Sequence, residues 1–114
     1  MSSLKLKDIS YARSGDKGDS ANVGVVFLNK ELYRWALTYL TPNRIKKYMG
    51  GIVKGDVIRY ELANINALNF ILKDCLGGGG SISMLNDAQG KTLAQAILMM
   101  DVEVPDTIDI TTND

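Results

Sequence analysis

The densest group of chemically active side chains in the sequence lies between positions 12 and 22. It combines a guanidinium, an ammonium, two carboxylates, hydroxyls and an amide, and it contains two glycines. Arg13 could clamp a carboxylate or a phosphate with two parallel hydrogen bonds, and Lys17 could add a point charge. Asp16 and Asp19 are the candidates for a general acid/base pair. The sequence predicts a loop that binds a small anion, with site residues Arg13, Ser14, Asp16, Lys17, Asp19 and Asn22.

The same loop also has a purely structural interpretation. Arg13 and Lys17 would then neutralise Asp16 and Asp19 as ion pairs at the tip of a hairpin. The spacing of the two aspartates matches no calcium-binding loop, so the sequence predicts no metal site. A loop that only had to turn would not require so many polar groups, which keeps the binding hypothesis open beside the structural one.

A run of glycines at positions 77–80 is the second candidate site. It does not satisfy the dinucleotide-binding fingerprint, and it follows a predicted helix rather than a strand. The segment Gly90-Lys91-Thr92 resembles the end of a P-loop, but Leu85 stands where the first glycine would be needed. We therefore predict no cofactor. The plain interpretation is a helix stop, and the alternative is a nest of backbone N–H groups that binds an anion, formed by Gly78, Gly79, Gly80 and Ser81.

Composition limits the classes of function. The chain of 114 residues fits one domain, which we place at 1–105 with a polar tail at 106–114. Lysine plus arginine and aspartate plus glutamate balance at 13 each, which argues against nucleic acid or an anionic membrane as partner. The chain has no histidine, so a Ser-His-Asp or Cys-His arrangement is excluded, and its single cysteine fits a reducing compartment. With no apolar leader or membrane-spanning run, we expect a cytoplasmic protein.

Hydrophobic periodicity predicts alternating strands and helices. Strands are expected at 4–11 and 21–28, paired as an antiparallel hairpin with the polar loop at its tip. A slip in the alternation near Asp8 indicates a bulge or a late strand start. Helices follow at 30–40 and 42–53, with Thr41 as cap and Gly55 as the left-handed stop. The prediction continues with a strand at 56–62, a helix at 64–76, a strand at 81–85 and a helix at 91–100. This order predicts an α+β, two-layer sandwich with helices on one face of the sheet.

The sequence resembles the small C-terminal domain of AtuA-type proteins, a family associated with acyclic terpene utilisation. The residues that carry the resemblance are YARSGDKGD at 11–19, NVG at 22–24, VIRYEL at 57–62, LNF at 68–70, LGGGG at 76–80 and DAQGK at 87–91. They span nearly the whole chain in the family's order. The resemblance implies a ferredoxin-like fold with a mostly antiparallel sheet. In the family this domain follows a larger domain or exists as a short separate protein, and the pathway context points to acyl-CoA metabolism.

Three functional hypotheses follow. The first is a non-catalytic accessory or binding module that docks on a larger AtuA-type partner chain or on itself, and presents residues 13–22 to an anionic group. The second is a small enzyme, or a subunit that completes an active site, in which Asp16 or Asp19 is the acid/base and Arg13 with Lys17 holds a carboxylate, phosphate or CoA thioester. The third is a purely structural oligomer. A homo-oligomer is compatible with all three, because a two-layer domain with one open sheet face often dimerises.

Overall fold

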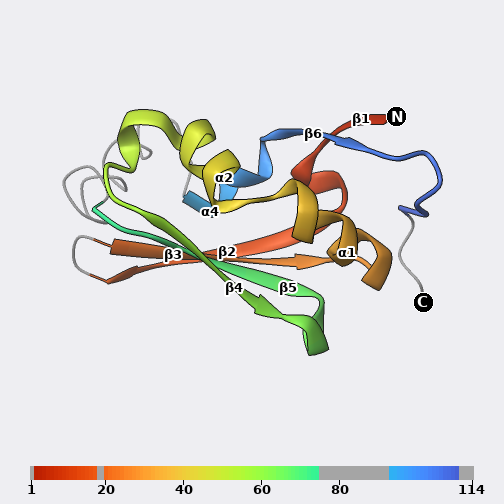
Figure 1. Ribbon diagram of the computed structural model, residues 1–114, viewed down its shortest axis with the longest axis horizontal. Helices are drawn as coiled ribbons and strands as arrows, with labels where there is room; N and C mark the ends of the chain where they lie inside the picture. Colours follow the sequence, from red (N-terminus) through yellow and green to blue (C-terminus); the bar gives the residue numbers. More distant parts are fainter. Residues whose placement is uncertain (1, 18–19, 75–92, 111–114) are drawn as a thin grey trace.

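The computed structural model describes residues 2–17, 20–74 and 93–110 (Figure 1). In these described ranges, three helices and three single turns of 3-10 helix, at Leu6–Asp8, Gly50–Ile52 and Ala63–Ile65, connect the strands. The helices are α1 (Lys30–Tyr39), α2 (Pro42–Met49) and α4 (Leu93–Leu98). The strands are β1 (Ser2–Lys5), β2 (Ser10–Lys17), β3 (Ser20–Phe27), β4 (Val57–Leu62), β5 (Ala67–Leu72) and β6 (Asp101–Val104).

Four strands form one antiparallel sheet in the order β2-β3-β5-β4, and β1 pairs with β6 in a separate antiparallel ribbon. Figure 1 shows the three helices and the β1–β6 ribbon on the same side of the four-stranded sheet. No element in the described part of the chain covers the other face of that sheet, which we call the open face. The predicted α+β fold, with an antiparallel sheet and helices on one face, is confirmed.

The core lies between the sheet and its helices. Strand side chains alternate between faces, so every second residue of β3 and β5 points toward the helices. Leu32 and Ala36 of α1 and Ile45 of α2 meet them there, all fully buried. The strand residues on this side are also buried, and they are Ala21, Val23, Val25, Phe27, Leu68, Phe70 and Leu72.

The helix ends follow from their flanking residues. Asn29 Oδ1 accepts the backbone N–H of Leu32 at 2.9 Å and begins α1. Thr41, as predicted, caps α2 by accepting the backbone N–H of Arg44. The prediction that Gly55 supplies the left-handed stop is wrong, because Gly50 does so with φ of +60°.

The predicted helix at 64–76 is wrong, since residues 67–72 form strand β5. Leu68, Phe70 and Leu72 alternate with period 2, whereas Ile65, Leu68, Ile71 and Leu72 recur at the spacing of a helical stripe. Asn66, with φ of 54°, follows the 3-10 turn Ala63–Ile65 and helps the chain reverse between β4 and β5. A short apolar run such as this fits both the two-residue period of a strand and the 3.6-residue period of a helix. Pairing with the neighbouring strands therefore decided in favour of the strand.

The two ends of the described chain also differ from the prediction. The expected strand at 4–11 is divided by the 3-10 turn Leu6–Asp8, which explains why Leu6 and Ile9 are both buried despite their odd spacing. Residues 101–104, expected to mark the end of the last helix, form β6. The predicted strand at 81–85 and residues 91–92 of the predicted last helix lie outside the described residues. No helix in residues 2–17, 20–74 or 93–110 is long and apolar enough to cross a membrane.

Candidate docking face

The predicted polar loop is mostly strand. β2 continues to Lys17 and β3 begins at Ser20, so only positions 18–19 separate them, and these lie outside the described residues. The register pairs Arg13 with Gly24 and Ser14 with Val23. Because neighbouring strand residues face opposite sides, the backbone places Arg13 on the open face and Ser14 on the helix side. The prediction of a single loop cluster is therefore wrong for these residues.

The remaining predicted site residues divide in the same way. The register puts position 15 opposite Asn22 and position 17 opposite Ser20, in line with Arg13 on the open face. Position 16 pairs with the buried Ala21 and belongs to the helix side. For Asp16 and Lys17 only these strand positions are described. The predicted site residues Asp19, Gly78, Gly79, Gly80 and Ser81 lie outside the described residues.

Asn22 and Asn69 meet at the centre of the open face. They come from the neighbouring strands β3 and β5, and Asn22 Nδ2 donates a hydrogen bond to Asn69 Oδ1 at 3.3 Å. The register aligns Asn69 with Gly24 and Arg13 on one side and with Tyr60 on the other. In this row the guanidinium of Arg13, the amide of Asn69 and the phenol of Tyr60 lie in line across the four strands. Gly24, between Arg13 and Asn69, has no side chain to separate them.

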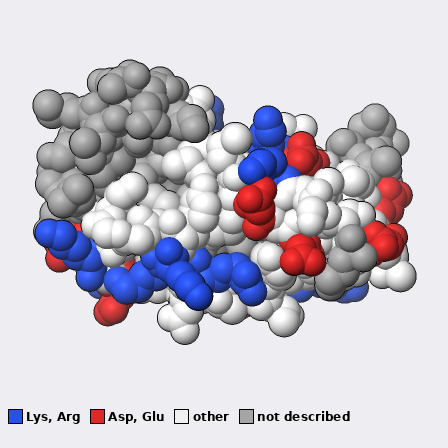
Figure 2. Space-filling view, turned by 90° about the horizontal axis from the view of Figure 1, so that it is seen from above, with Lys and Arg blue, Asp and Glu red and all other residues white. Residues whose placement is uncertain are grey.

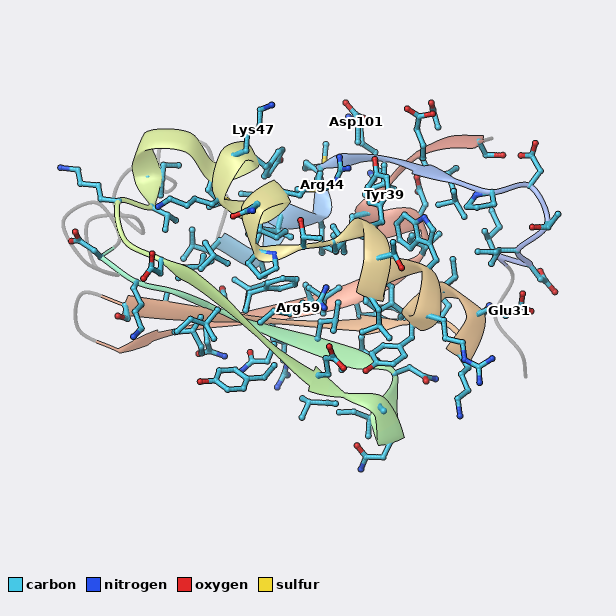
Figure 3. All side chains as sticks on the ribbon, in the orientation of Figure 1. Glu31, Tyr39, Arg44, Lys47, Arg59 and Asp101 are labelled. Carbon is cyan, nitrogen blue, oxygen red and sulfur yellow. The ribbon has the colours of Figure 1, made fainter. Side chains whose placement is uncertain are left out.

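An apolar row lies beside this polar one. Tyr11, Val26, Ala67 and Leu62 face one another in the register of the four strands. Tyr11 is 66% exposed, Val26 39% and Leu62 40%, while Tyr60 in the neighbouring row is 53% exposed. In Figure 3 the side chains below the ribbon leave the sheet on the side away from the helices. Ala67, which lies between Val26 and Leu62 in this row, is buried. Exposed apolar side chains grouped on one face in this way are a feature of interaction surfaces.

The register gives the open face a defined charge. Its positions run along alternate residues of each strand, and none of them is an aspartate or a glutamate. Arg13 is exposed there, and Lys17 occupies a position on the same face. The described side chains of the face are thus apolar in the row of Tyr11 and Leu62, and the next row combines the Arg13 guanidinium with the Asn69 amide.

Asn69 was not among the predicted candidate residues because its segment was assigned to a helix. The alternation of Leu68, Phe70 and Leu72 was the signal that could have identified a strand with Asn69 on its opposite face. Among the described residues, no group of three or more histidine, cysteine, aspartate or glutamate side chains could hold a metal ion.

The sequence matches a known protein family over most of its length. The family model of the AtuA ferredoxin-like domain matches residues 4–103. The chain belongs to this family. The match spans β1 to β6 apart from the first two and last residues, so in this AtuA ferredoxin-like domain the open face lies wholly within the matched region. Searches of curated proteins and of solved structures found no match.

Proposed function

We propose that this AtuA ferredoxin-like domain is a non-catalytic binding module that docks on a partner protein through its open sheet face. The observation that carries the proposal is the set of exposed apolar side chains, Tyr11, Val26, Tyr60 and Leu62, on a face that no described element covers. Exposing them to water is unfavourable by roughly 25 cal/mol for each Å² of apolar surface, so a partner that buries them gains that free energy.

The charge of the face supports a partner of complementary chemistry. Arg13 is exposed, and no register position on the face supplies a carboxylate to meet it. Two copies docked face to face would bring their own arginines into an interface without counter-charge, which is unfavourable when water is excluded. The partner surface we propose is therefore apolar with at least one carboxylate, on a different chain such as a larger AtuA-type protein.

The amide pair supports recognition at the centre of the face. Asn69 keeps its side-chain N–H donors after accepting from Asn22, and a carboxamide can donate and accept toward a partner's backbone or side chain. The backbone positions do not bring Arg13 and Asp16 to one side of the sheet. The acid/base arrangement considered from the sequence accordingly lacks support in the described residues, and the binding role is preferred.

Charge reversal tests the proposal. The tagged protein and its Arg13→Glu variant are purified gently from the organism's own cells and analysed by native mass spectrometry. Lys47→Glu is the matched control, because Lys47 is also an exposed cation but lies on α2, on the opposite side of the sheet. We expect a larger chain with the wild type and with Lys47→Glu, and its loss with Arg13→Glu.

Two results would contradict the proposal. One is equal recovery of the larger chain with both variants, since the open face would then not be the docking surface. The other is a wild-type homodimer that persists at micromolar concentration in sedimentation velocity and is abolished by Arg13→Glu. That outcome would assign the face to a second copy of the chain.

A further inference from the structure

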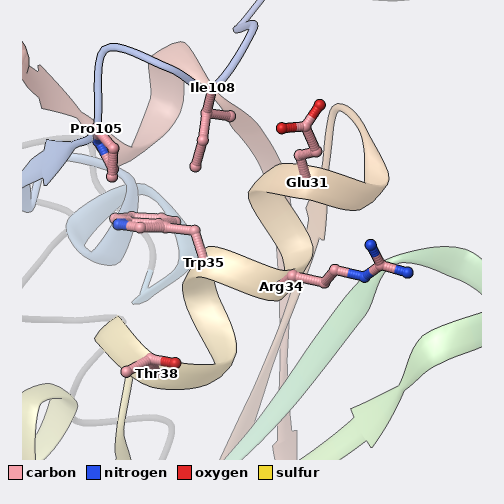
Figure 4. A pocket seen from close by; sticks show the side chains of 6 residues that line it. All are labelled: Glu31, Arg34, Trp35, Thr38, Pro105 and Ile108. Carbon is pink, nitrogen blue, oxygen red and sulfur yellow. The ribbon is translucent and has the colours of Figure 1, made fainter.

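A second surface feature lies on the helix side of the molecule, around the only tryptophan of the chain. Trp35 lies on α1 beside the segment that follows β6 (Figure 4). A hollow of about 440 Å³ opens there, and the residues that line it are Glu31, Arg34, Trp35, Thr38, Pro105 and Ile108. This hollow is separate from the open sheet face, so a ligand could occupy it whether or not a partner docks on that face.

The indole is held in a fixed orientation. Trp35 Nε1 donates to the backbone carbonyl of Glu103 at 3.2 Å, and Tyr39 stacks against the ring with centroids 4.8 Å apart. The Tyr39 hydroxyl in turn accepts the backbone N–H of Glu103 at 3.3 Å. Arg44 lies over the Tyr39 ring, with its guanidinium carbon 4.0 Å from the centroid. An aromatic surface that is already ordered loses little conformational entropy when a ligand binds.

One carboxylate, Glu31, and one guanidinium, Arg34, are among the residues that line the hollow. Figure 4 shows the Glu31 carboxylate on the Ile108 side of the hollow, and the guanidinium of Arg34, which also lines the hollow, directed away from Trp35. Glu31 is exposed and forms no ion pair with any described residue. Figure 2, which looks onto the helix side, shows acidic side chains gathered at this end of the molecule. Asp106 and Asp109, which adjoin the lining residues Pro105 and Ile108 in sequence, are exposed, and Asp106 Oδ1 accepts a hydrogen bond from Ser2 Oγ at 2.7 Å.

We propose that this hollow binds an arginine side chain of a partner protein. An indole attracts a cation through the negative electrostatic potential of its ring face, and the Glu31 carboxylate at the rim of the hollow adds a charged hydrogen-bond acceptor. A guanidinium fits this pair better than an ammonium, because its planar group stacks on a ring while its N–H groups bind a carboxylate. Pro105 and Ile108 would pack against the methylene groups of the same side chain.

The single tryptophan makes the test direct. The full chain is titrated with N-acetyl-L-arginine methylamide, and binding is followed by Trp35 fluorescence and by the single indole N–H signal in NMR. The matched probe is the citrulline analogue, which has nearly the same shape without the charge. We expect saturable binding of the arginine probe, with a Kd of about 1 mM as for a weak small-molecule contact, and no saturation with citrulline at the same concentrations.

Two variants complete the test. Glu31→Gln should weaken binding of the arginine probe roughly two- to fivefold, as expected for loss of an exposed ion pair. Glu61→Gln, a control on β4 that does not line the hollow, should leave it unchanged. The proposal is overturned if the arginine probe does not saturate, if citrulline binds equally well, or if Glu31→Gln binds with wild-type affinity.

Discussion

Asn22 Nδ2 and Asn69 Oδ1 lie 3.3 Å apart across strands β3 and β5, on the face of the sheet that no described helix covers. The two amides lie over glycines. A Cβ atom added at Gly15 would be 3.0 Å from Asn22 Oδ1, and one added at Gly24 would be 3.8 Å from Asn69 Oδ1. The glycines therefore leave room for an amide pair that lies along the sheet. The centre of the open face is consequently polar and does not protrude.

The amide pair should contribute modestly to stability. Asn69→Ala removes one partly buried hydrogen bond, so we expect the free energy of unfolding to fall by about 1 kcal/mol. Urea denaturation followed by circular dichroism measures the change. Asn64→Ala is the matched control, because Asn64 is exposed in the 3-10 turn Ala63–Ile65, and it should change stability by less than about 0.5 kcal/mol. Equal effects of the two substitutions would contradict the role given to the pair.

Gly24 and Gly55 should respond differently to the same substitution. A Cβ at Gly24 meets only Asn69 Oδ1 at 3.8 Å, so Gly24→Ala should leave the free energy of unfolding within about 1 kcal/mol of wild type. A Cβ at Gly55 would lie 2.7 Å from the backbone carbonyl oxygen of Lys73, so Gly55→Ala must displace backbone and should cost at least about 2 kcal/mol. Thermal and urea unfolding compare the two variants. A Gly55→Ala variant as stable as Gly24→Ala would show that the close approach of Gly55 to Lys73 is not required for stability.

Arg59 should contribute more to stability than its surface-strand position suggests. Its Nη1 donates to the backbone carbonyls of Leu37 and Leu40, at 2.8 and 2.9 Å, and so satisfies the C-terminal end of α1. Arg59→Met keeps most of the side-chain volume but leaves these carbonyls without their charged donor. We expect a loss of about 2 kcal/mol in the free energy of unfolding. Arg34→Met, an exposed arginine on α1, should change stability by less than about 0.5 kcal/mol, and a similar loss in both would contradict the capping role.

The fold was more predictable from the sequence than the site. Strand β3 and helices α1 and α2 were recoverable, because long apolar runs and the cap at Thr41 act locally. Segment 67–72 was not, since its six residues fit both a strand and part of a helical stripe, and only pairing with β3 and β4 decides between them.

The candidate site shows the same limit of local reasoning. The sequence predicted Arg13 and Asn22 as site residues of one polar loop, with Asn22 also at the start of the predicted strand 21–28. In a strand pair, alternation separates Arg13 from Ser14 and brings Asn22 to Asn69, which lies 47 positions further along the chain. Such a juxtaposition depends on register across three strands, and residue types within one segment do not encode it.

Alkaline pH should destabilise the protein through Lys5. A hydrogen bond to Asp101, at 2.6 Å, raises the pKa of Lys5 above its ordinary value of 10.5. Because the folded pKa is the higher one, the stabilisation is fully present below pH 10.5 and is lost as the pH rises through the folded pKa. Urea denaturation from pH 9 to about 12 should show this decline, and Asp101→Asn should make it shallower. An identical pH dependence in the variant would rule out this ion pair as the cause.

Photo-cross-linking from the open face tests the central claim most directly. The photoreactive residue p-benzoylphenylalanine replaces Tyr60 on the open face or, as a matched control, Tyr48 on α2, which is 41% exposed on the helix side. The proteins are expressed in their own cells, irradiated, and the cross-linked peptides sequenced by mass spectrometry. The docking account predicts that position 60 cross-links to a different chain, at an apolar segment containing aspartate or glutamate, and that position 48 does not. Cross-links from position 60 only to copies of the same chain, or no more than from position 48, would contradict it.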